Sequence, residues 1–208
     1  MTEQAATVFV VDDDAAVRRS LCELFASVSL PVEAYSSSRE FLDAFDPRRP
    51  GCLLLDMRLK EGSGLDLQDE LRRRDVRLPI IVLTGHGDVA SSVRALKAGA
   101  FDFLQKPPPP AELLDRIYAA IENDRAAREA ASRRAEGLDR LSSLTPRERE
   151  VMALLVAGST SKEVAYDMGI SVRTIEGHRR RILSKLQVTS AAQLVRFVMN
   201  ARGDKTED

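Results

Sequence analysis

The sequence predicts a doubly wound α/β domain with a five-stranded parallel sheet, followed by an all-α domain of four helices. Over roughly the first 120 residues short apolar runs alternate with amphipathic segments, which is typical of parallel strands joined by crossover helices. The last third shows helical patterns only, separated by turn signals. A chain of 208 residues suits two such domains.

Short apolar runs mark the five strands. Each is bounded by turn residues or by an amphipathic segment and is too short for a buried helix. The expected strands are Val8–Val11, Val32–Tyr35, Cys52–Leu55, Pro79–Leu83 and Phe101–Leu104. Apolar side chains at helical spacing predict the helices between and after them, over residues 17–28, 41–45, 65–71, 89–96 and 113–121.

Three segments follow from this pattern. Residues 1–122 form the α/β domain and residues 144–208 the all-α domain. Residues 123–143 between them are charged, rich in alanine and free of proline, with Gly137 as their one glycine. This composition predicts a solvated helical linker.

Polar residues of suitable chemistry follow four of the predicted strands. Because the carboxyl ends of parallel strands meet at one edge of the sheet, these side chains are expected to converge there. They are Asp12, Asp13, Asp56, Thr84 and Lys106. Three carboxylates would repel one another without a cation, and Mg²⁺ prefers such oxygen ligands while leaving room for a phosphoryl oxygen. The pattern favours phosphoryl transfer to a carboxylate.

The last third predicts a helix-turn-helix. Thr145 and Glu148 form a capping box with Pro146 at the first helical position, and Gly169 lies in a turn between two helices within 160–186. The second of these helices carries Arg173, Arg179, Arg180, Arg181 and Lys185. A basic helix alone is usually a solvated face, but the preceding turn favours DNA binding.

Composition excludes several other classes. The formal net charge is −1, and a hydrophobic content of 44% is enough for a packed core. The two cysteines, Cys22 and Cys52, lack metal-type spacing, so we expect buried reduced thiols in a cytoplasmic protein. We expect no membrane span and no export signal.

The first domain resembles the CheY-type receiver family, closest to its FixJ/StyR branch. The motifs that carry the resemblance are Val8–Asp14, Leu54–Arg58, Thr84–Asp88 and Lys106–Pro107. It implies strand order 2-1-3-4-5 and a sensor histidine kinase as partner. It also implies that Asp56 is the phosphoacceptor and that Thr84 and Lys106 contact the phosphoryl group. By the same resemblance Asp12, Asp13, Asp56 and the backbone carbonyl of Arg58 bind Mg²⁺, Lys106–Pro107 is cis, and Phe103 turns inward as Thr84 moves.

The chain departs from that family at two places. The family usually has proline four residues after the phosphoacceptor, where this chain has Lys60. It usually has phenylalanine after Lys-Pro, where this chain continues as Pro107–Pro110. Both departures alter loops beside the expected site, and we expect them to affect kinetics more than chemistry.

The last third resembles the LuxR/NarL-type DNA-binding family. The resemblance rests on Leu144–Val151, Lys162–Ala165, Val172–His178 and Lys185–Val188. By position it implies that Glu176, Gly177 and Arg180 face base edges of double-stranded DNA. It implies phosphate contacts for Lys162, Arg173, Thr174, Arg179 and Lys185. His178 fits a core position or a phosphate contact equally well.

Together the two resemblances imply a two-component response regulator of the FixJ/NarL family. It would control transcription as an activator, with RNA polymerase as a further partner, and would form a homodimer when phosphorylated. Residues expected on the dimer face are Arg94, Lys97, Asp102 and Arg116, and Arg58 and His86 are expected to govern the lifetime of the aspartyl phosphate.

Two alternative functions fit the sequence less well. Phosphatases with a strand-end aspartate nucleophile need a second acid two residues later, where this chain has Arg58, so we expect no enzyme of that kind. A DNA-binding protein with a silent dimerisation scaffold would not need the complete set of acidic residues.

Overall fold

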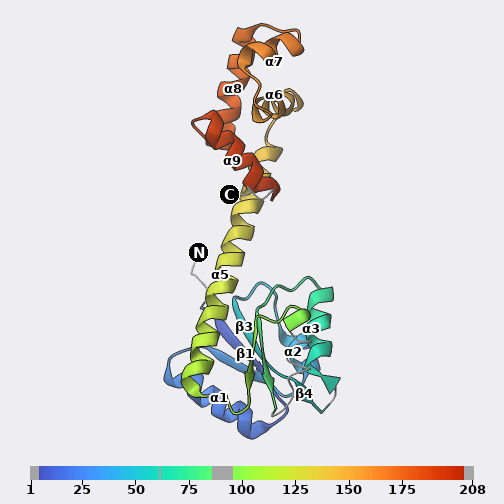
Figure 1. Ribbon diagram of the computed structural model, residues 1–208, viewed down its shortest axis with the longest axis vertical. Coiled ribbons are helices and arrows are strands. Elements are labelled where there is room, and N and C mark those ends of the chain that lie inside the picture. The colour runs from blue at the N-terminus through green and yellow to red at the C-terminus, as the bar shows by residue number, and fades with distance from the viewer. Residues whose placement is uncertain (1–4, 61, 86–95, 204–208) are drawn as a thin grey trace. The chain divides into compact units, whose positions relative to one another are not determined.

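The computed structural model describes residues 5–60, 62–85 and 96–203. Contacts between residues divide the chain into two compact units, Met1–Ala127 and Arg128–Asp208 (Figure 1). Each unit is described by itself below.

The first unit is built on a parallel sheet of five strands. The strands are β1 (Thr7–Val11), β2 (Val32–Tyr35), β3 (Gly51–Asp56), β6 (Ile80–Thr84) and β7 (Asp102–Gln105). Their order is β2-β1-β3-β6-β7 and all four pairings are parallel, which confirms the predicted fold and strand order. Because β3 and β6 end at Asp56 and Thr84, both side chains are delivered to the same edge of the sheet.

Helices cover both faces of this sheet. Figure 1 shows α1 (Ala15–Ser27) and α5 (Pro110–Ser142) on one side, and α2 (Ser38–Ala44) and α3 (Gly64–Arg73) on the other. Phe41 and Leu71 pack on one face of the sheet, and Phe25 and Ile117 on the other. The strands are therefore buried on both faces, which explains their nearly continuous apolar sequences. The helix expected over residues 89–96 falls largely outside the described residues.

The start of β3 is fixed by a glycine. Gly51 has φ +150°, and a Cβ there would lie 1.9 Å from the backbone oxygen of Thr7 on β1. Its N–H donates a 2.9 Å hydrogen bond to Oδ2 of Asp124, a buried residue of α5. No larger residue fits this site without moving the backbone of β1 or β3.

A small hairpin that the sequence pattern did not predict follows β3. Its strands β4 (Arg58–Leu59) and β5 (Gly62–Ser63) pair antiparallel. Two residues per strand are too few for an alternating pattern to be recognised in the sequence. Arg58 lies on the first strand of this hairpin, and Lys60 lies in the turn between the two strands.

The second unit contains α6 (Pro146–Val156), α7 (Ser161–Asp167), α8 (Val172–Leu186) and α9 (Ala191–Arg202). Their apolar side chains form one core, with Val151, Val164, Ile175 and Ile182 fully buried. The predicted capping box of Thr145 and Glu148 is present at the start of α6. The all-α prediction is confirmed, and α7 and α8 form the expected helix-turn-helix around Gly169, whose φ is +65°.

The predicted helix at 113–121 and the predicted linker at 123–143 belong to one helix, α5. The part of α5 after Ala127 belongs to the second unit. There Gly137 lies against α9, where a Cβ would be 3.0 Å from Cβ of Ala201. The glycine therefore permits close packing of α5 on α9.

Both cysteines are free thiols, Cys52 buried and Cys22 partly buried. The expectation of burial therefore holds for Cys52 and only in part for Cys22. Burial, with a smaller contribution from the charge of Asp124, raises the pKa of Cys52 to about 12, so this thiol stays protonated. Among the described residues we find no helix with the length and apolar character needed to span a membrane.

Candidate phosphoacceptor site and nucleic-acid interface

The structure brings together the carboxylates that the sequence placed at the strand ends. Asp12, Asp13 and Asp56, here called the acidic cluster, each offer one oxygen within 4.8 Å of the others. Asp12 and Asp13 directly follow β1, and Asp56 is the last residue of β3. Asp12 is fully buried and Asp56 nearly so. Negative charges this close together and this deeply buried need a positive charge nearby to be stable.

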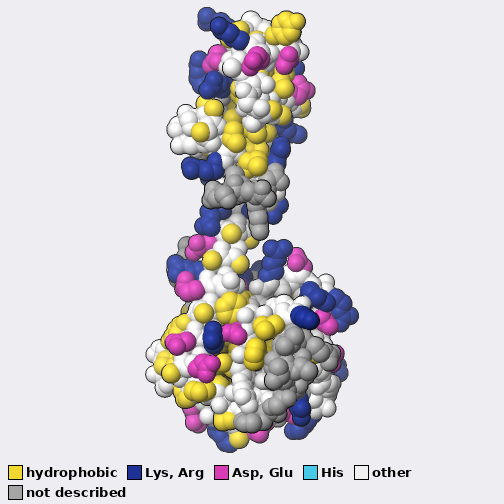
Figure 2. Space-filling model, in the orientation of Figure 1, with side chains coloured by type: hydrophobic (Ala, Val, Ile, Leu, Met, Phe, Trp, Pro, Cys, Tyr) yellow, Lys and Arg dark blue, Asp and Glu magenta, His cyan; other side chains and the backbone are white. Residues whose placement is uncertain are grey.

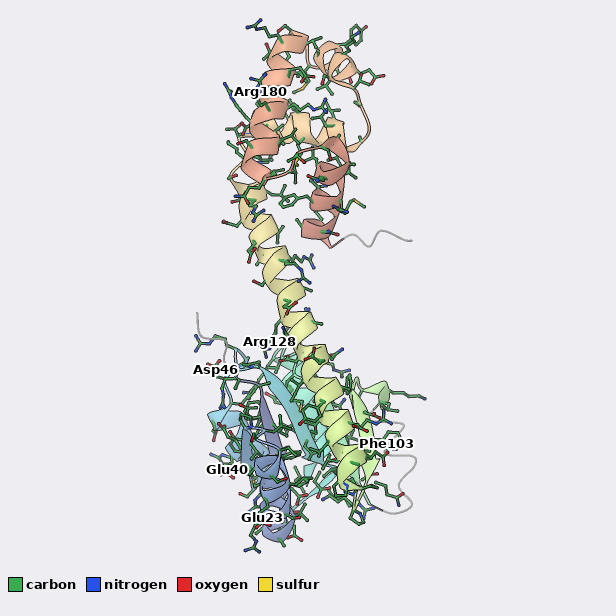
Figure 3. All side chains as sticks on the ribbon, turned by 90° about the vertical axis from the view of Figure 1, so that its left-hand side faces the viewer. Glu23, Glu40, Asp46, Phe103, Arg128 and Arg180 are labelled. Atoms are coloured by element: carbon green, nitrogen blue, oxygen red, sulfur yellow. The ribbon has the colours of Figure 1, made fainter. Side chains whose placement is uncertain are left out.

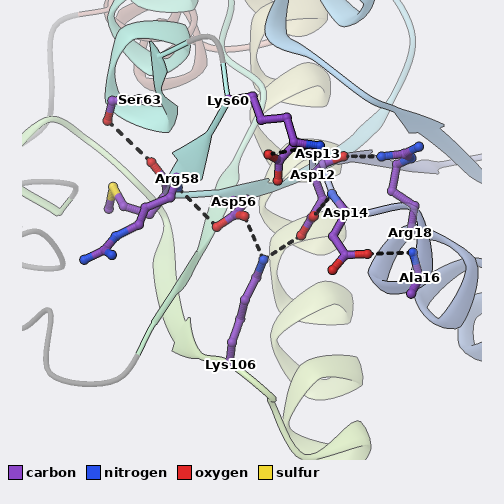
Figure 4. Close-up of polar contacts among 11 residues, drawn as sticks. Asp12, Asp13, Asp14, Ala16, Arg18, Asp56, Arg58, Lys60, Ser63 and Lys106 are labelled. Atoms are coloured by element: carbon purple, nitrogen blue, oxygen red, sulfur yellow. Dashed lines mark hydrogen bonds and ion pairs between the residues drawn. The ribbon is translucent and has the colours of Figure 1, made fainter.

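Lys106 supplies part of that countercharge. Its Nζ lies 2.6 Å from Oδ2 of Asp12 and 2.8 Å from Oδ2 of Asp56 (Figure 4). The predicted cis bond between Lys106 and Pro107 is present. The backbone N–H of Lys106 donates to the backbone oxygen of Thr84, which ties the ends of the last two strands together.

Burial and neighbouring charges alter the ionisation of this site in a consistent way. Desolvation raises the pKa of Asp56, only partly offset by hydrogen bonds from Lys106 and from the backbone N–H of Arg58, while the charge of Asp12 raises it further. Burial alone would lower the pKa of Lys106, but its hydrogen bonds to Asp12 and Asp56 outweigh burial and raise it. Lys106 therefore stays charged. A cation bound beside Asp56 would stabilise the ionised form of its carboxyl group.

The donor set fits a hard divalent cation. Carboxylate oxygens from three residues converge, and Mg²⁺ and Ca²⁺ both favour such oxygens over nitrogen or sulfur. Arg58, expected to add its backbone carbonyl, begins β4 two residues after the end of β3, and its N–H lies 3.2 Å from Oδ1 of Asp56. The residues present thus fit a hard divalent cation.

Thr84 and Phe103 lie on neighbouring strands. Thr84 ends β6 and is 3% exposed, at the sheet edge where the acidic cluster lies. Phe103 on β7 is 39% exposed, so its ring is outside the core in this structure (Figure 3). An inward turn of Phe103 would therefore be a change from the conformation seen here. His86 and Arg94 lie outside the described residues.

In the second unit α8 presents basic residues to solvent. Figure 2 shows dark-blue Lys and Arg side chains on the unit, and Figure 3 shows Arg180 projecting from α8 away from the other helices. Arg173, Glu176, Arg180 and Lys162 of α7 are exposed. Among the described residues, the guanidinium groups of Arg173 and Arg180 form no hydrogen bond or ion pair with the protein. Both are available to an external anion.

Four other predicted DNA-contact residues already have partners within the unit. Glu176 lies 3.9 Å from Arg179 in an ion pair. Lys185 Nζ lies 2.7 Å from Oε2 of the buried Glu148 and 3.1 Å from the backbone oxygen of Ser143. Arg179 Nη1 lies 3.5 Å from Oγ of Ser161. Thr174 shares a 2.8 Å hydrogen bond with Ser171, the N-cap of α8. A phosphate would compete with these contacts.

Lys185 and Glu148 show what the sequence pattern missed. Glu148 was recognised as a capping residue, but 37 positions separate it from Lys185, and no local pattern joins them. The side chain of Lys185, with the backbone of Thr145, holds the pKa of Glu148 below its usual value of 4.5. The pair ties the start of α6 to the end of α8, so Lys185 has a structural role whether or not it reaches DNA.

Gly177 and His178 occupy central positions of α8. A Cβ at Gly177 would meet no atom within 4 Å, so the packing of the unit does not require glycine there. His178 is partly buried, and its Nδ1 is buried without a hydrogen-bond partner among the described residues. Burial of this ring atom supports the core alternative for His178 over a phosphate contact.

Comparisons with known proteins agree with both halves of this picture. Residues 8–118 match the family described as response regulator receiver domain, and residues 142–198 match the bacterial regulatory proteins of the luxR family. The transcriptional regulatory protein TdiR of Thauera aromatica is 46% identical over 198 residues, which cover 95% of this chain and 87% of that protein. The transcriptional regulatory protein FixJ of Azorhizobium caulinodans is 40% identical, covering 95% of this chain and 94% of that protein.

Solved structures extend the likeness to three dimensions. The response regulator StyR superposes with a TM-score of 0.84 at 40% identity, covering 93% of this chain and 98% of StyR. Full-length FixJ from B. japonicum gives a TM-score of 0.60 at 36% identity, covering 98% of this chain and all of the other.

Proposed function

We propose a phosphorylation switch for this chain, which belongs to the response regulators that join a receiver domain to a LuxR-type DNA-binding domain. In this proposal a sensor histidine kinase transfers a phosphoryl group to Asp56, and the modified protein binds specific double-stranded DNA and activates transcription. The observation that carries the proposal is the acidic cluster with Lys106 between Asp12 and Asp56, in a chain that also contains a helix-turn-helix.

In the proposed reaction a carboxylate oxygen of Asp56 attacks the phosphorus atom. An oxygen–phosphorus bond to Asp56 forms while the bond between phosphorus and the donor breaks, and the donor leaves with the bonding electrons. Lys106 and the hydroxyl of Thr84 donate to phosphoryl oxygens. Asp12, Asp13, Asp56 and the backbone carbonyl of Arg58 would hold Mg²⁺, which would supply positive charge to offset the charge of the phosphoryl oxygens.

Coupling to the rest of the receiver is assigned to Thr84 and Phe103. Thr84 moves when its hydroxyl binds the phosphoryl group, and Phe103 then occupies the space that Thr84 leaves. The exposed position of Phe103 in this structure is consistent with the unmodified state.

We assign the contacts of the DNA-binding segment, residues 144–208, to two classes. Glu176, Gly177 and Arg180 face base edges in the major groove. The phosphate backbone is contacted by Lys162, Arg173, Thr174, Arg179 and Lys185. Of these, Thr174, Arg179 and Lys185 would exchange the intramolecular contacts described above for contacts with DNA, so we expect Lys162 and Arg173 to carry most of the phosphate binding.

Further partners are proposed on the same basis. Phosphorylation favours a homodimer, and the activated protein contacts RNA polymerase in the cytoplasm. Asp102 and Arg116, expected on the dimer face, form an ion pair of 3.2 Å within this chain. A dimer through that face would have to break or share this pair.

We propose no hydrolytic activity on other phosphate esters. Arg58 stands two residues after Asp56, where aspartate-dependent phosphatases need a general acid. A chromogenic phosphate ester should therefore be hydrolysed no faster with the protein than with buffer.

The central test is phosphorylation by acetyl phosphate with Mg²⁺ or with EDTA, followed by peptide mass spectrometry. We expect one phosphoryl group on Asp56, formed only with Mg²⁺ and absent from Asp56→Asn. Asp69→Asn changes an aspartate of α3 with a half-exposed side chain paired with Arg72; it is the matched control and should be labelled like the parent. Labelling of Asp56→Asn at the rate of the parent would refute the assignment.

DNA binding is tested on the same samples. The full chain, with and without a beryllofluoride mimic, is used to select sequences from a genomic library. We expect enrichment of defined sites that increases with the mimic in the parent but not in Asp56→Asn. Enrichment that ignores the mimic would contradict control by phosphorylation.

A further inference from the structure

A second lysine lies at the acidic cluster. Lys60, in the turn between β4 and β5, has its Nζ 4.0 Å from Oδ2 of Asp13. Figure 4 shows Lys60 and Lys106 on opposite sides of the carboxylates. The two lysines therefore divide the cluster, with Lys106 on Asp12 and Asp56 and Lys60 on Asp13.

The two lysines differ in how firmly they are held. The side chain of Lys106 is 24% exposed and makes two short contacts. That of Lys60 is 79% exposed and makes one long contact. An ion pair this exposed contributes little to stability, because water screens it. Lys60 can therefore leave Asp13 at little cost, whereas Lys106 cannot leave its partners without leaving buried charge unpaired.

The surroundings of Lys60 allow such a displacement. A cavity of about 280 Å³ adjoins it, lined by Asp13, Ser36, Ser37, Ser38, Leu59 and Lys60. Serine hydroxyls in this cavity offer oxygens to an ammonium group that has left Asp13.

We propose that Lys60 is a displaceable countercharge that sets how tightly the acidic cluster binds its divalent cation and how strongly the loaded site attracts a phosphoryl donor. The proposal rests on the phosphoacceptor function assigned to Asp56. Lys60 is a positioning residue, since it acts through Asp13 and through its charge and not by contact with the reacting atoms.

The two expected effects have opposite signs. Three carboxylates outnumber two ammonium groups by one charge, and a divalent cation reverses the sign of that balance. Lys60 therefore repels the incoming cation and competes with it for Asp13, which weakens cation binding. Once the cation is bound, the same positive charge attracts an anionic phosphoryl donor. A general distortion of the loop would weaken both properties together.

The test compares Lys60→Gln and Lys60→Arg with the parent in the full chain. Arg77→Gln is the matched control, because Arg77 and Asp75 form another exposed pair, at 3.6 Å, beside the opposite end of β6. Calorimetric titration with Mg²⁺ measures cation affinity without any phosphorylation. Intact-mass measurements at saturating Mg²⁺ give the second-order rate constant for acetyl phosphate.

For Lys60→Gln we expect Mg²⁺ binding about two- to fivefold tighter and a second-order rate constant about two- to fivefold lower, the scale of one exposed charge. Lys60→Arg and Arg77→Gln should match the parent. Both effects should shrink in about 1 M salt, where the screening length falls to about 3 Å.

The proposal is overturned if Lys60→Gln changes both quantities unfavourably, changes neither, or behaves as Arg77→Gln does. Failure of the phosphoacceptor assignment is seen separately. In that case the parent takes no phosphoryl group on Asp56, while the Mg²⁺ titration still reports on competition between Lys60 and the cation.

Discussion

The acidic cluster and helix α8 differ in how their charged side chains are surrounded: those of the cluster are crowded and largely buried, and those of α8 are separate and mostly exposed. In the cluster three carboxylates are crowded within 4.8 Å, two of them are buried, and Lys106 partly neutralises them. On α8, Arg173 and Arg180 are exposed and have no partner among the described residues. Buried carboxylates that lie close together repel one another, so binding of a cation stabilises them. Exposed arginines are solvated, so they cost little free energy when no anion is bound.

This difference separates the two sites in their response to mutation. Each group in the cluster depends on the others, so a single change should have a large effect that is not additive. Exposed arginines act nearly independently, so changes on α8 should be modest and sensitive to salt.

The largest effect is expected at Lys106. Lys106→Met leaves Asp12 and Asp56 buried without their cation and should reduce the free energy of unfolding of the first unit by about 3 kcal/mol in EDTA. Mg²⁺ should restore part of this loss. Hydrogen exchange of amides in β1 and β3 measures it, with Arg181→Ala on α8 as the contrast, which should change stability by less than about 0.5 kcal/mol. Equal small effects in both variants would remove the contrast between the two regions.

Arg180 is the next test, because it sharpens the description of α8. Arg180→Ala should weaken binding to the cognate site by about 1–3 kcal/mol and relax the preference at one base pair. Arg173→Ala should weaken cognate and scrambled duplexes alike and lower the salt slope by about one unit. Titrations at several salt concentrations separate these outcomes. An equal loss on both duplexes for Arg180→Ala would make it a phosphate contact.

Substitution of Gly177 should have smaller effects, which are opposite in sign for stability and for DNA binding. Because a Cβ there meets nothing within the unit, Gly177→Ala should stabilise α8 by about 1 kcal/mol. It should also weaken DNA binding if the helix approaches the bases closely at this point. Urea unfolding and duplex titration measure the two quantities, with Ser184→Ala, an exposed position on the same helix, as control. Unchanged DNA affinity would show that Gly177 does not lie against the bases.

The smallest effects concern pH, and the two units should respond in opposite directions. The pKa of Asp56 is raised above 3.8, so its contribution to stability is present below that value and is lost as pH rises through the folded pKa. The pKa of Glu148 is lowered below 4.5 by Lys185, so its contribution is present above that value and is lost as pH falls through the folded pKa.

Unfolding of the full chain in EDTA, followed by hydrogen exchange between about pH 3 and 7, separates the two units. Asp56→Asn should flatten the dependence of the first unit, and Glu148→Gln or Lys185→Met that of the second. Slopes of the same sign in both units would contradict the assigned causes.

The sequence predicted what depends on local periodicity and chain order. Strands, helix-turn-helix and the convergence of Asp12, Asp56 and Lys106 follow from apolar runs and from the rule that parallel strands end at one edge. Hairpin β4–β5 was missed because each strand has two residues. Because Lys60 lies in the turn of this hairpin, its position beside Asp13 could not be predicted either.

Contacts between distant residues were beyond the same reasoning. Lys185 was predicted as a phosphate contact from its place near a helix end, and its pairing with Glu148 depends on how α6 packs against α8. The continuity of α5 was missed for a different reason. Both of its parts were predicted as helical, but the change from apolar to charged composition was interpreted as a boundary, while the backbone continues without a break.

Phosphoryl acceptance by Asp56 should depend on Gly51, a residue at the other end of the same strand. Residue 51 begins the strand that Asp56 ends, and any side chain there would collide with the backbone of Thr7. In a library of all single substitutions, position 51 should tolerate glycine alone, and phosphoryl acceptance should be lost there as completely as at position 56. A map of functional tolerance would thus mark both ends of β3, one for its chemistry and the other for its lack of a side chain.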